Sequence, residues 1–213
     1  MTAWMYTCSV AVVRPIRSLD SEPLALHAHA MDNLRFIRET MERAGSFTAV
    51  PGSGGIAMGL TALLAAVLAA GRPESWYWFG IWIGAAVVAI AIGVLAAARK
   101  AHAAKAKLLS GPGRKFVLGL VPPILAGAVI SIALLRAGLP GPIPGTWLLL
   151  YGTGVLTGGA ASVKVIPVMG LCFMAMGAMA LFSPLPAGNW FLAAGFGGLH
   201  IVFGTIIRVK YGG

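Results

Sequence analysis

The chain is poor in acidic residues, in cysteine and in catalytic motifs. Six Asp and Glu stand against sixteen Lys and Arg among 213 residues. The two cysteines, Cys8 and Cys172, lie in the N-terminal segment and in a long apolar run, so no disulfide framework is expected. The sequence has no nucleophile elbow, P-loop, His-Glu-x-x-His motif or dinucleotide-binding glycine loop. These absences argue against the enzyme classes that depend on such motifs.

Charged side chains are also rare along most of the chain. Between Arg43 and Arg208 only ten occur, and they leave uncharged runs of 28, 24, 20, 27 and 43 residues. A bilayer core requires about 20 apolar residues per helix. Four runs therefore predict one transmembrane helix each, and the last run predicts two.

The predicted fold is all-α: a polytopic membrane protein with six transmembrane helices preceded by a cytoplasmic amphipathic helix. We expect a disordered tail at residues 1–20, the amphipathic helix at 21–45, and the transmembrane bundle at 46–213. The six spans are predicted at 50–71, 76–98, 116–135, 146–163, 165–182 and 190–207. The N-terminus lacks the basic start of a signal peptide, and the sequence leaves open whether translation begins at Met1 or at Met31.

The amphipathic helix has one apolar face with helical spacing. This face consists of Leu26, Ala30, Leu34, Ile37, Met41 and Ala44. Three acidic and three basic residues between 24 and 45 balance one another, whereas a helix that binds anionic lipid is rich in Lys and Arg. The balance favours contact with protein: the bundle itself, a second copy of the chain, or a partner.

Basic residues are distributed unevenly between the two predicted sides of the membrane. Fourteen fall in the tail, the second loop, the fourth loop and the C-terminus, and only Arg72 and Arg136 fall on the other side. The excess of basic residues marks the cytoplasmic side, so both termini are predicted to lie in the cytoplasm. The membrane is predicted to be the plasma membrane. The net charge of +10 is explained by this placement, and no nucleic-acid partner is expected.

Glycine pairs predict close packing of the helices. Three G-x-x-x-G pairs, at 55 and 59, 80 and 84, and 154 and 158, allow helix backbones to approach closely within a bundle or a homo-oligomer. A Gly-Leu pair early in three alternate helices also suggests three stacked helical hairpins, either by duplication or by chance.

Three features are candidate functional sites. His200 is the only ionisable group deep in a predicted span, and it is either a proton- or metal-handling residue or a neutral histidine bonded to a hydroxyl or carbonyl. Pro122 and Pro123 either kink their helix or divide it around a polar cavity. Cys172 and Met176 share a helical face with two further methionines, which suits either Cu(I) or ordinary packing.

The isolation of His200 favours its structural role, and no cofactor or metal is predicted. We expect a structural or accessory membrane subunit without catalysis of its own. The alternative is a small transporter or channel for a neutral or weakly polar solute. Polar side chains that converge on an interior cavity would favour transport, whereas a solid core would favour the subunit.

Overall fold

The computed structural model describes residues 29–38, 41, 51–72, 75–103, 105, 111–160, 162–183 and 187–211. Their regular secondary structure is helical, and no strand occurs in these ranges. The predicted all-α class is therefore confirmed. The chain divides into two units, Met1–Met41 and Glu42–Gly213.

In the first unit, residues 29–38 form a helix within the range predicted for the amphipathic helix. The side chains of Leu34, Ile37 and Met41 are exposed. Residues 1–20 and, apart from Met41, the rest of 21–45 lie outside the described residues, so the predicted tail and the full length of the helix stay predictions.

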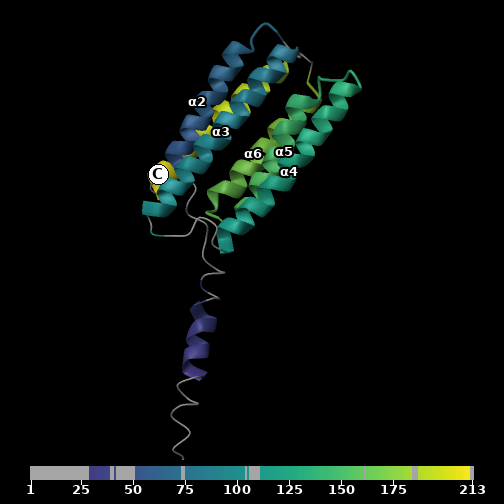
Figure 1. The fold of residues 1–213 in the computed structure, drawn as a ribbon. Coiled ribbons are helices and arrows are strands. Elements are labelled where there is room, and N and C mark those ends of the chain that lie inside the picture. The colour runs from purple at the N-terminus through teal and green to yellow at the C-terminus, as the bar shows by residue number, and fades with distance from the viewer. Residues whose placement is uncertain are drawn as a thin grey trace, which may run out of the picture. The chain divides into compact units, whose positions relative to one another are not determined.

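The second unit is a bundle of helices (Figure 1). Its elements are α2 (Gly52–Leu68), α3 (Trp76–Ala103), α4 (Gly111–Arg136), α5 (Ile143–Gly159), α6 (Val165–Leu181), α7 (Gly188–Leu192), the π-helix η2 (Ala193–Leu199) and α8 (His200–Tyr211). Each of the six ranges predicted as spans coincides with a helix or, for the last, with the segment from α7 to α8.

Among the described residues, three helical segments are long and apolar enough to cross a membrane: α3, α4 and the segment Gly188–Tyr211. The helices α2 and α6 are apolar but have 17 residues each. The outer faces of the long helices carry exposed apolar side chains such as Leu95, Leu125 and Val129. Large exposed apolar surfaces of this kind are typical of contact with lipid.

The helices pack as two groups of three. In the α2 group, α2 contacts both α3 and α8, and in the α5 group, α5 contacts both α4 and α6. The segment of α7 and η2 contacts both groups, whereas α3 and α4 scarcely touch each other. This arrangement differs from three stacked hairpins, because α8 packs mainly on α2 and only slightly on α6.

Glycines bring the backbones of neighbouring helices together within each group. A Cβ atom on Gly152 would lie 2.7 Å from the Gly170 carbonyl oxygen, and one on Gly59 would lie 2.7 Å from the Gly197 carbonyl oxygen. Side chains larger than hydrogen therefore cannot occupy these contacts. By contrast, no described atom lies within 4 Å of a Cβ placed on Gly80 or Gly84, so the G-x-x-x-G pair of α3 packs on none of the described helices.

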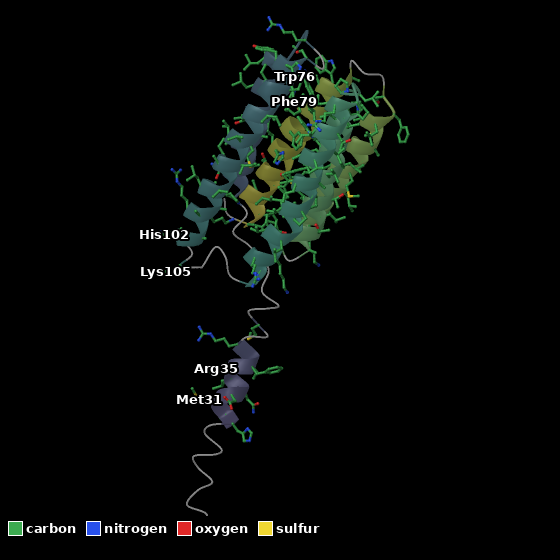
Figure 2. All side chains as sticks on the ribbon, turned by 45° about the vertical axis from the view of Figure 1, so that its right-hand side comes forward. Met31, Arg35, Trp76, Phe79, His102 and Lys105 are labelled. Carbon is green, nitrogen blue, oxygen red and sulfur yellow. The ribbon has the colours of Figure 1, made fainter. Side chains whose placement is uncertain are left out.

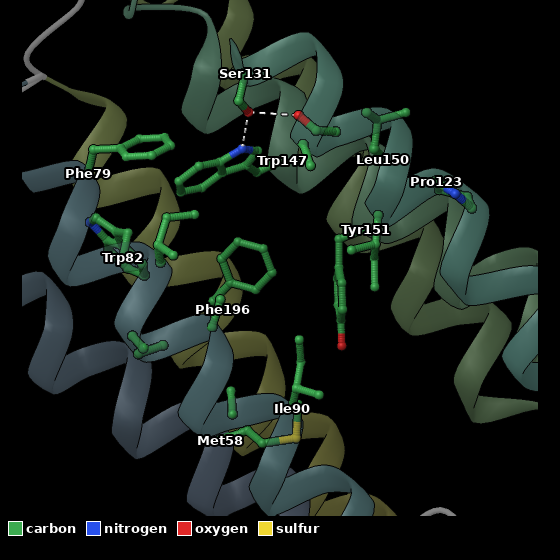
Figure 3. A pocket seen from close by; sticks show the side chains of 18 of the residues that line it. Met58, Phe79, Trp82, Ile90, Pro123, Ser131, Trp147, Leu150, Tyr151 and Phe196 are labelled. Atoms are coloured by element: carbon green, nitrogen blue, oxygen red, sulfur yellow. Dashed lines mark hydrogen bonds between the residues drawn. The ribbon is translucent and has the colours of Figure 1, made fainter. Parts of the chain in front are cut away.

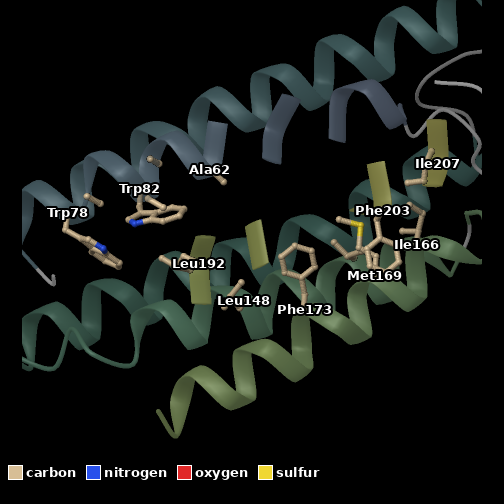
Figure 4. Close-up of a cluster of buried hydrophobic side chains, with 14 of the residues drawn as sticks. Ala62, Trp78, Trp82, Leu148, Ile166, Met169, Phe173, Leu192, Phe203 and Ile207 are labelled. Atoms are coloured by element: carbon tan, nitrogen blue, oxygen red, sulfur yellow. The ribbon is translucent and has the colours of Figure 1, made fainter. Parts of the chain in front are cut away.

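Between the two groups lies a core of buried apolar side chains (Figure 4). Leu148 of α5, Phe173 of α6 and Leu192 of α7 are fully buried there. Trp78 and Trp82 of α3 lie at one end of this core, and Ile207 of α8 lies at the other. The core therefore joins the two groups along most of their length.

The two ends of the bundle differ in character. Figure 2 shows Trp76 and Phe79 at one end, and His102 and Lys105 at the other. The Lys100 ammonium donates a hydrogen bond to the Tyr211 carbonyl oxygen at 3.3 Å, which places the C-terminal ends of α3 and α8 together.

Candidate functional site

A cavity of about 440 Å³ lies between the two groups, beside the core (Figure 3). All parts of the bundle except α6 and α7 contribute to its walls, and the wall of α3 runs from Phe79 to Ile90. None of the lining residues is charged. Volumes of this size are typical of sites for small organic ligands.

Two hydrogen-bonded residues, Tyr151 and His200, give the cavity its main polar feature. The Tyr151 hydroxyl lies 2.8 Å from His200 Nε2, and His200 Nδ1 lies 2.9 Å from the Phe196 carbonyl oxygen. A carbonyl can only accept, so Nδ1 carries the proton of the neutral ring and Nε2 accepts from the tyrosine. Both ring nitrogens of the buried histidine are thus satisfied.

Aromatic rings hold this pair in position. The ring of Tyr151 meets Phe173 and Phe196 edge to face, with centroids 4.9 and 5.2 Å apart. The His200 ring lies 5.2 Å from Phe173 in the same geometry. Edge-to-face contacts fix ring orientation, so the direction of the tyrosine hydroxyl is set by its neighbours.

The π-helix η2 ends directly before His200. Such π segments insert an extra residue into a helical turn and often occur at functional sites. Here the segment contains three glycines, at 195, 197 and 198, and it passes between α2 and the α5 group. Phe196 and His200 are four residues apart, so they lie on the same side of this segment, and both line the cavity.

A second polar cluster centres on Asn189 of α7. The indole N–H groups of Trp78 and Trp82 both donate to Asn189 Oδ1, at 3.2 and 3.1 Å. Asn189 Nδ2 in turn donates to the Ala66 carbonyl oxygen at 3.0 Å. That carbonyl lies in the last turn of α2, where the N–H of Ala70 bonds to Val67 instead. One amide therefore joins α2, α3 and α7.

Ser131 and Trp147 connect α4 with α5 at the same end of the cavity (Figure 3). The indole N–H of Trp147 donates to Ser131 Oγ at 2.7 Å, and the serine hydroxyl donates to the Gly127 carbonyl oxygen at 2.7 Å. Trp147 also stacks on Trp78 with centroids 6.0 Å apart. These bonds use the proton and one lone pair of the buried Ser131 hydroxyl and the N–H of Trp147, and they join α4 to α5. By contrast, the Tyr151 hydroxyl oxygen accepts no hydrogen bond from the described residues.

The proline pair does not divide α4, which is continuous from Gly111 to Arg136. The idea of two half-helices is therefore wrong. Pro123 has no N–H for the Gly119 carbonyl four residues earlier, and the Thr157 hydroxyl of α5 lies 3.0 Å from that oxygen. Thr157 also lies 2.9 Å from its own Thr153 carbonyl oxygen, so its single proton serves two acceptors. Pro123 lines the cavity, whereas Pro122 does not.

Cys172 and Met176 lie on α6, away from the cavity walls. Both are partly buried against the core, as packing residues are. Met169 is buried and Met179 is exposed, so the sulfur atoms of this face do not converge on one pocket. Within the described residues, no three His, Cys, Asp or Glu side chains are grouped as a metal site.

The structure brings His200 and Pro123 to one cavity but adds residues that the sequence did not single out. Tyr151, Asn189, Trp82 and Ser131 carry no motif. A signal existed for two of them, because Tyr151 lies in the middle of the apolar helix α5, and Asn189, in the apolar segment Gly188–Tyr211, is the only asparagine after Asn33 in the sequence. A polar residue in such a helix requires a partner, although the sequence does not name it.

Comparison of the chain with protein-family models, with curated proteins and with solved structures finds no match. The fold and the cavity are therefore the basis for the function.

Proposed function

We propose that the chain is a six-span protein of the plasma membrane with both termini in the cytoplasm. Three helices are long enough to cross, and α2, α5 and α6 have 17 residues each, or about 25 Å, which is near the lower limit for a span. The described basic residues support the orientation, because all except Arg72 and Arg136 lie in segments that are predicted to face the cytoplasm.

Within this architecture, the protein binds and carries a small solute that is largely apolar and carries no charge. One observation supports this function above the others: the bundle contains a cavity of about 440 Å³ whose uncharged walls include one oriented tyrosine–histidine pair. A purely structural subunit does not need such a space, since membrane helices gain stability from close packing. The transporter class is thus favoured over the accessory subunit.

Photoaffinity labelling tests this function. A small aryl diazirine is added to the full-length protein in lipid nanodiscs, and modified peptides are identified by mass spectrometry. We expect labelling of Leu150 and Tyr151 inside the cavity. Ala89→Phe fills the cavity from α3 and should abolish that labelling, while Ala91→Phe, on the exposed side of the same helix, should leave it unchanged. Equal labelling in both variants would contradict the proposed site.

A second candidate function, the accessory subunit, is favoured by the first unit. Its helix at 29–38 exposes Leu34 and Ile37, and a charge-balanced apolar face of this kind fits a protein partner. Affinity purification in mild detergent followed by mass spectrometry tests it. Leu34→Asp should release a partner that co-purifies with the unaltered chain, while Arg35→Asp, about 100° around the helix from Leu34, serves as the control. Absence of any partner in stoichiometric amount would rule this function out.

A further inference from the structure

The cavity opens sideways, between α3 and α4. These two helices scarcely touch. Four isoleucines of the cavity wall are exposed at this opening: Ile83 and Ile90 of α3, and Ile124 and Ile132 of α4. In a bundle that spans a membrane, an apolar opening between the sides of two helices faces the hydrocarbon region. A ligand would therefore enter from the lipid phase.

The shape of the cavity suits an elongated ligand. Its wall on α4 runs from Pro123 to Ile132, a length of about 14 Å along the helix axis at 1.5 Å per residue. A volume of about 440 Å³ over this length corresponds to a cross-section of roughly 30 Å². This cross-section holds a hydrocarbon chain or a narrow ring system. A charged headgroup is excluded, because no lining residue would compensate its charge.

The hydrogen bonds at Tyr151 define the polar group of the ligand. The tyrosine proton is already donated to His200 Nε2, and the Nδ1 proton of His200 is donated to the Phe196 carbonyl. What the pair still offers to a ligand is a lone pair on the tyrosine oxygen, which accepts but does not donate. Figure 3 shows this oxygen directed into the space between the helix groups.

We propose that the ligand is a neutral lipid alcohol: a membrane-soluble molecule with an apolar chain or ring body and one hydroxyl that donates to Tyr151. This inference rests on the proposed solute-binding function and narrows it to one chemical class. An ether or ester of the same body lacks the donor proton. Its oxygen is only an acceptor and would lie against the acceptor oxygen of Tyr151. To bind it, the tyrosine would have to donate its proton to the ligand and leave His200 Nε2 without a hydrogen bond.

A pair of ligands that differ only in the donor proton tests the proposal. The probes are 12-bromododecanol and its methyl ether, whose bromine quenches nearby tryptophan fluorescence. They are titrated into full-length protein in nanodiscs. Trp82 and Trp147 line the cavity, so the double variant Trp82→Phe/Trp147→Phe gives the background quenching by probe in the bulk lipid.

In the unaltered protein, we expect the alcohol to quench above background with an affinity roughly fivefold higher than the ether, as one net hydrogen bond provides. In the double variant Tyr151→Phe/His200→Phe, the two probes should bind equally, because the tyrosine oxygen is gone and so is the His200 Nε2 lone pair that loss of the tyrosine hydroxyl alone would free. The comparison of the two probes in the unaltered protein does not depend on the folding of any variant.

Other outcomes distinguish failure of the solute-binding function from failure of the lipid-alcohol proposal. If neither probe quenches above background, both the solute-binding function and the lipid alcohol fail. If both bind with equal affinity to the unaltered protein, the cavity binds solutes but does not recognise a hydroxyl. If the preference for the alcohol persists in Tyr151→Phe/His200→Phe, a different group recognises the hydroxyl and the assignment to Tyr151 is refuted.

Discussion

Asn189 provides the strictest test of how the bundle is held together. Its side chain accepts from the indole N–H groups of Trp78 and Trp82 and donates to the carbonyl of Ala66. The two indole rings are 2% and 3% exposed, so water cannot replace Asn189 as their partner without entering the core. The substitution Asn189→Leu keeps the size of the side chain and removes all three hydrogen bonds.

The expected loss follows from the number of bonds. A hydrogen bond between membrane helices contributes about 0.6 kcal/mol on average, and one in a soluble protein contributes up to about 1.5 kcal/mol. Three bonds therefore correspond to a loss of about 2–4 kcal/mol in the free energy of unfolding. Thr153→Val is the matched control, because its hydroxyl bonds only to the Leu149 carbonyl of its own helix, and its loss should stay below about 0.5 kcal/mol.

Unfolding by titration with SDS in mixed micelles, followed by circular dichroism, measures both variants. A loss below about 1 kcal/mol for Asn189→Leu, or one equal to that of the control, would refute the argument. It would mean that the indole groups find other partners and that Asn189 does not join the three helices.

Three further predictions concern packing, topology and the polar pair. Gly152→Ala should destabilise the bundle by about 1–3 kcal/mol in the same titration, because its Cβ would meet backbone atoms of α6 at 2.7 Å. Gly84→Ala is the control and should be neutral or slightly stabilising, because no described atom lies within 4 Å of its Cβ. A cysteine introduced at Pro142 should react with an impermeant maleimide from outside intact cells, while labelling of a C-terminal cysteine from outside would overturn the topology. His200→Phe should lower stability by about 1–3 kcal/mol, because the Tyr151 hydroxyl loses its acceptor, and wild-type stability in this variant would show that the hydrogen bond is not needed.

Helix positions could be predicted from the sequence because they depend on the hydrophobicity of residues that are close together in the chain. Uncharged runs between charged residues predicted six helical ranges, and the helices coincide with them. Two glycine pairs, at 55 and 59 and at 154 and 158, were also correctly assigned to helix packing. The pair at 80 and 84 has the same spacing but no neighbour in this chain, because a motif shows which side chains are small and not which helix lies opposite.

The candidate site could be predicted from the sequence only in part. His200 was noticed because an ionisable residue in an apolar run is rare, yet its partner Tyr151 lies 49 positions earlier. The proline pair was expected either to kink α4 or to divide it, and the helix is continuous. A hydroxyl of α5 lies beside the carbonyl that Pro123 leaves without its usual donor. Compensation of this kind depends on a neighbouring helix, and spacing along one helix cannot reveal it.

The sequence by itself determined the helical class, the approximate helix ends and the uneven distribution of charge, because these properties depend on hydrophobicity and on residues close together in the chain. Only the tertiary structure decided that α8 packs on α2, that α3 and α4 stay apart, and that a cavity with an oriented tyrosine oxygen lies between them. The physical reason is that apolar helices have similar hydropathy, so hydropathy does not determine which helix packs on which. Their pairing is instead selected by close contacts of small residues and by a few interhelical hydrogen bonds, which form only when distant segments meet.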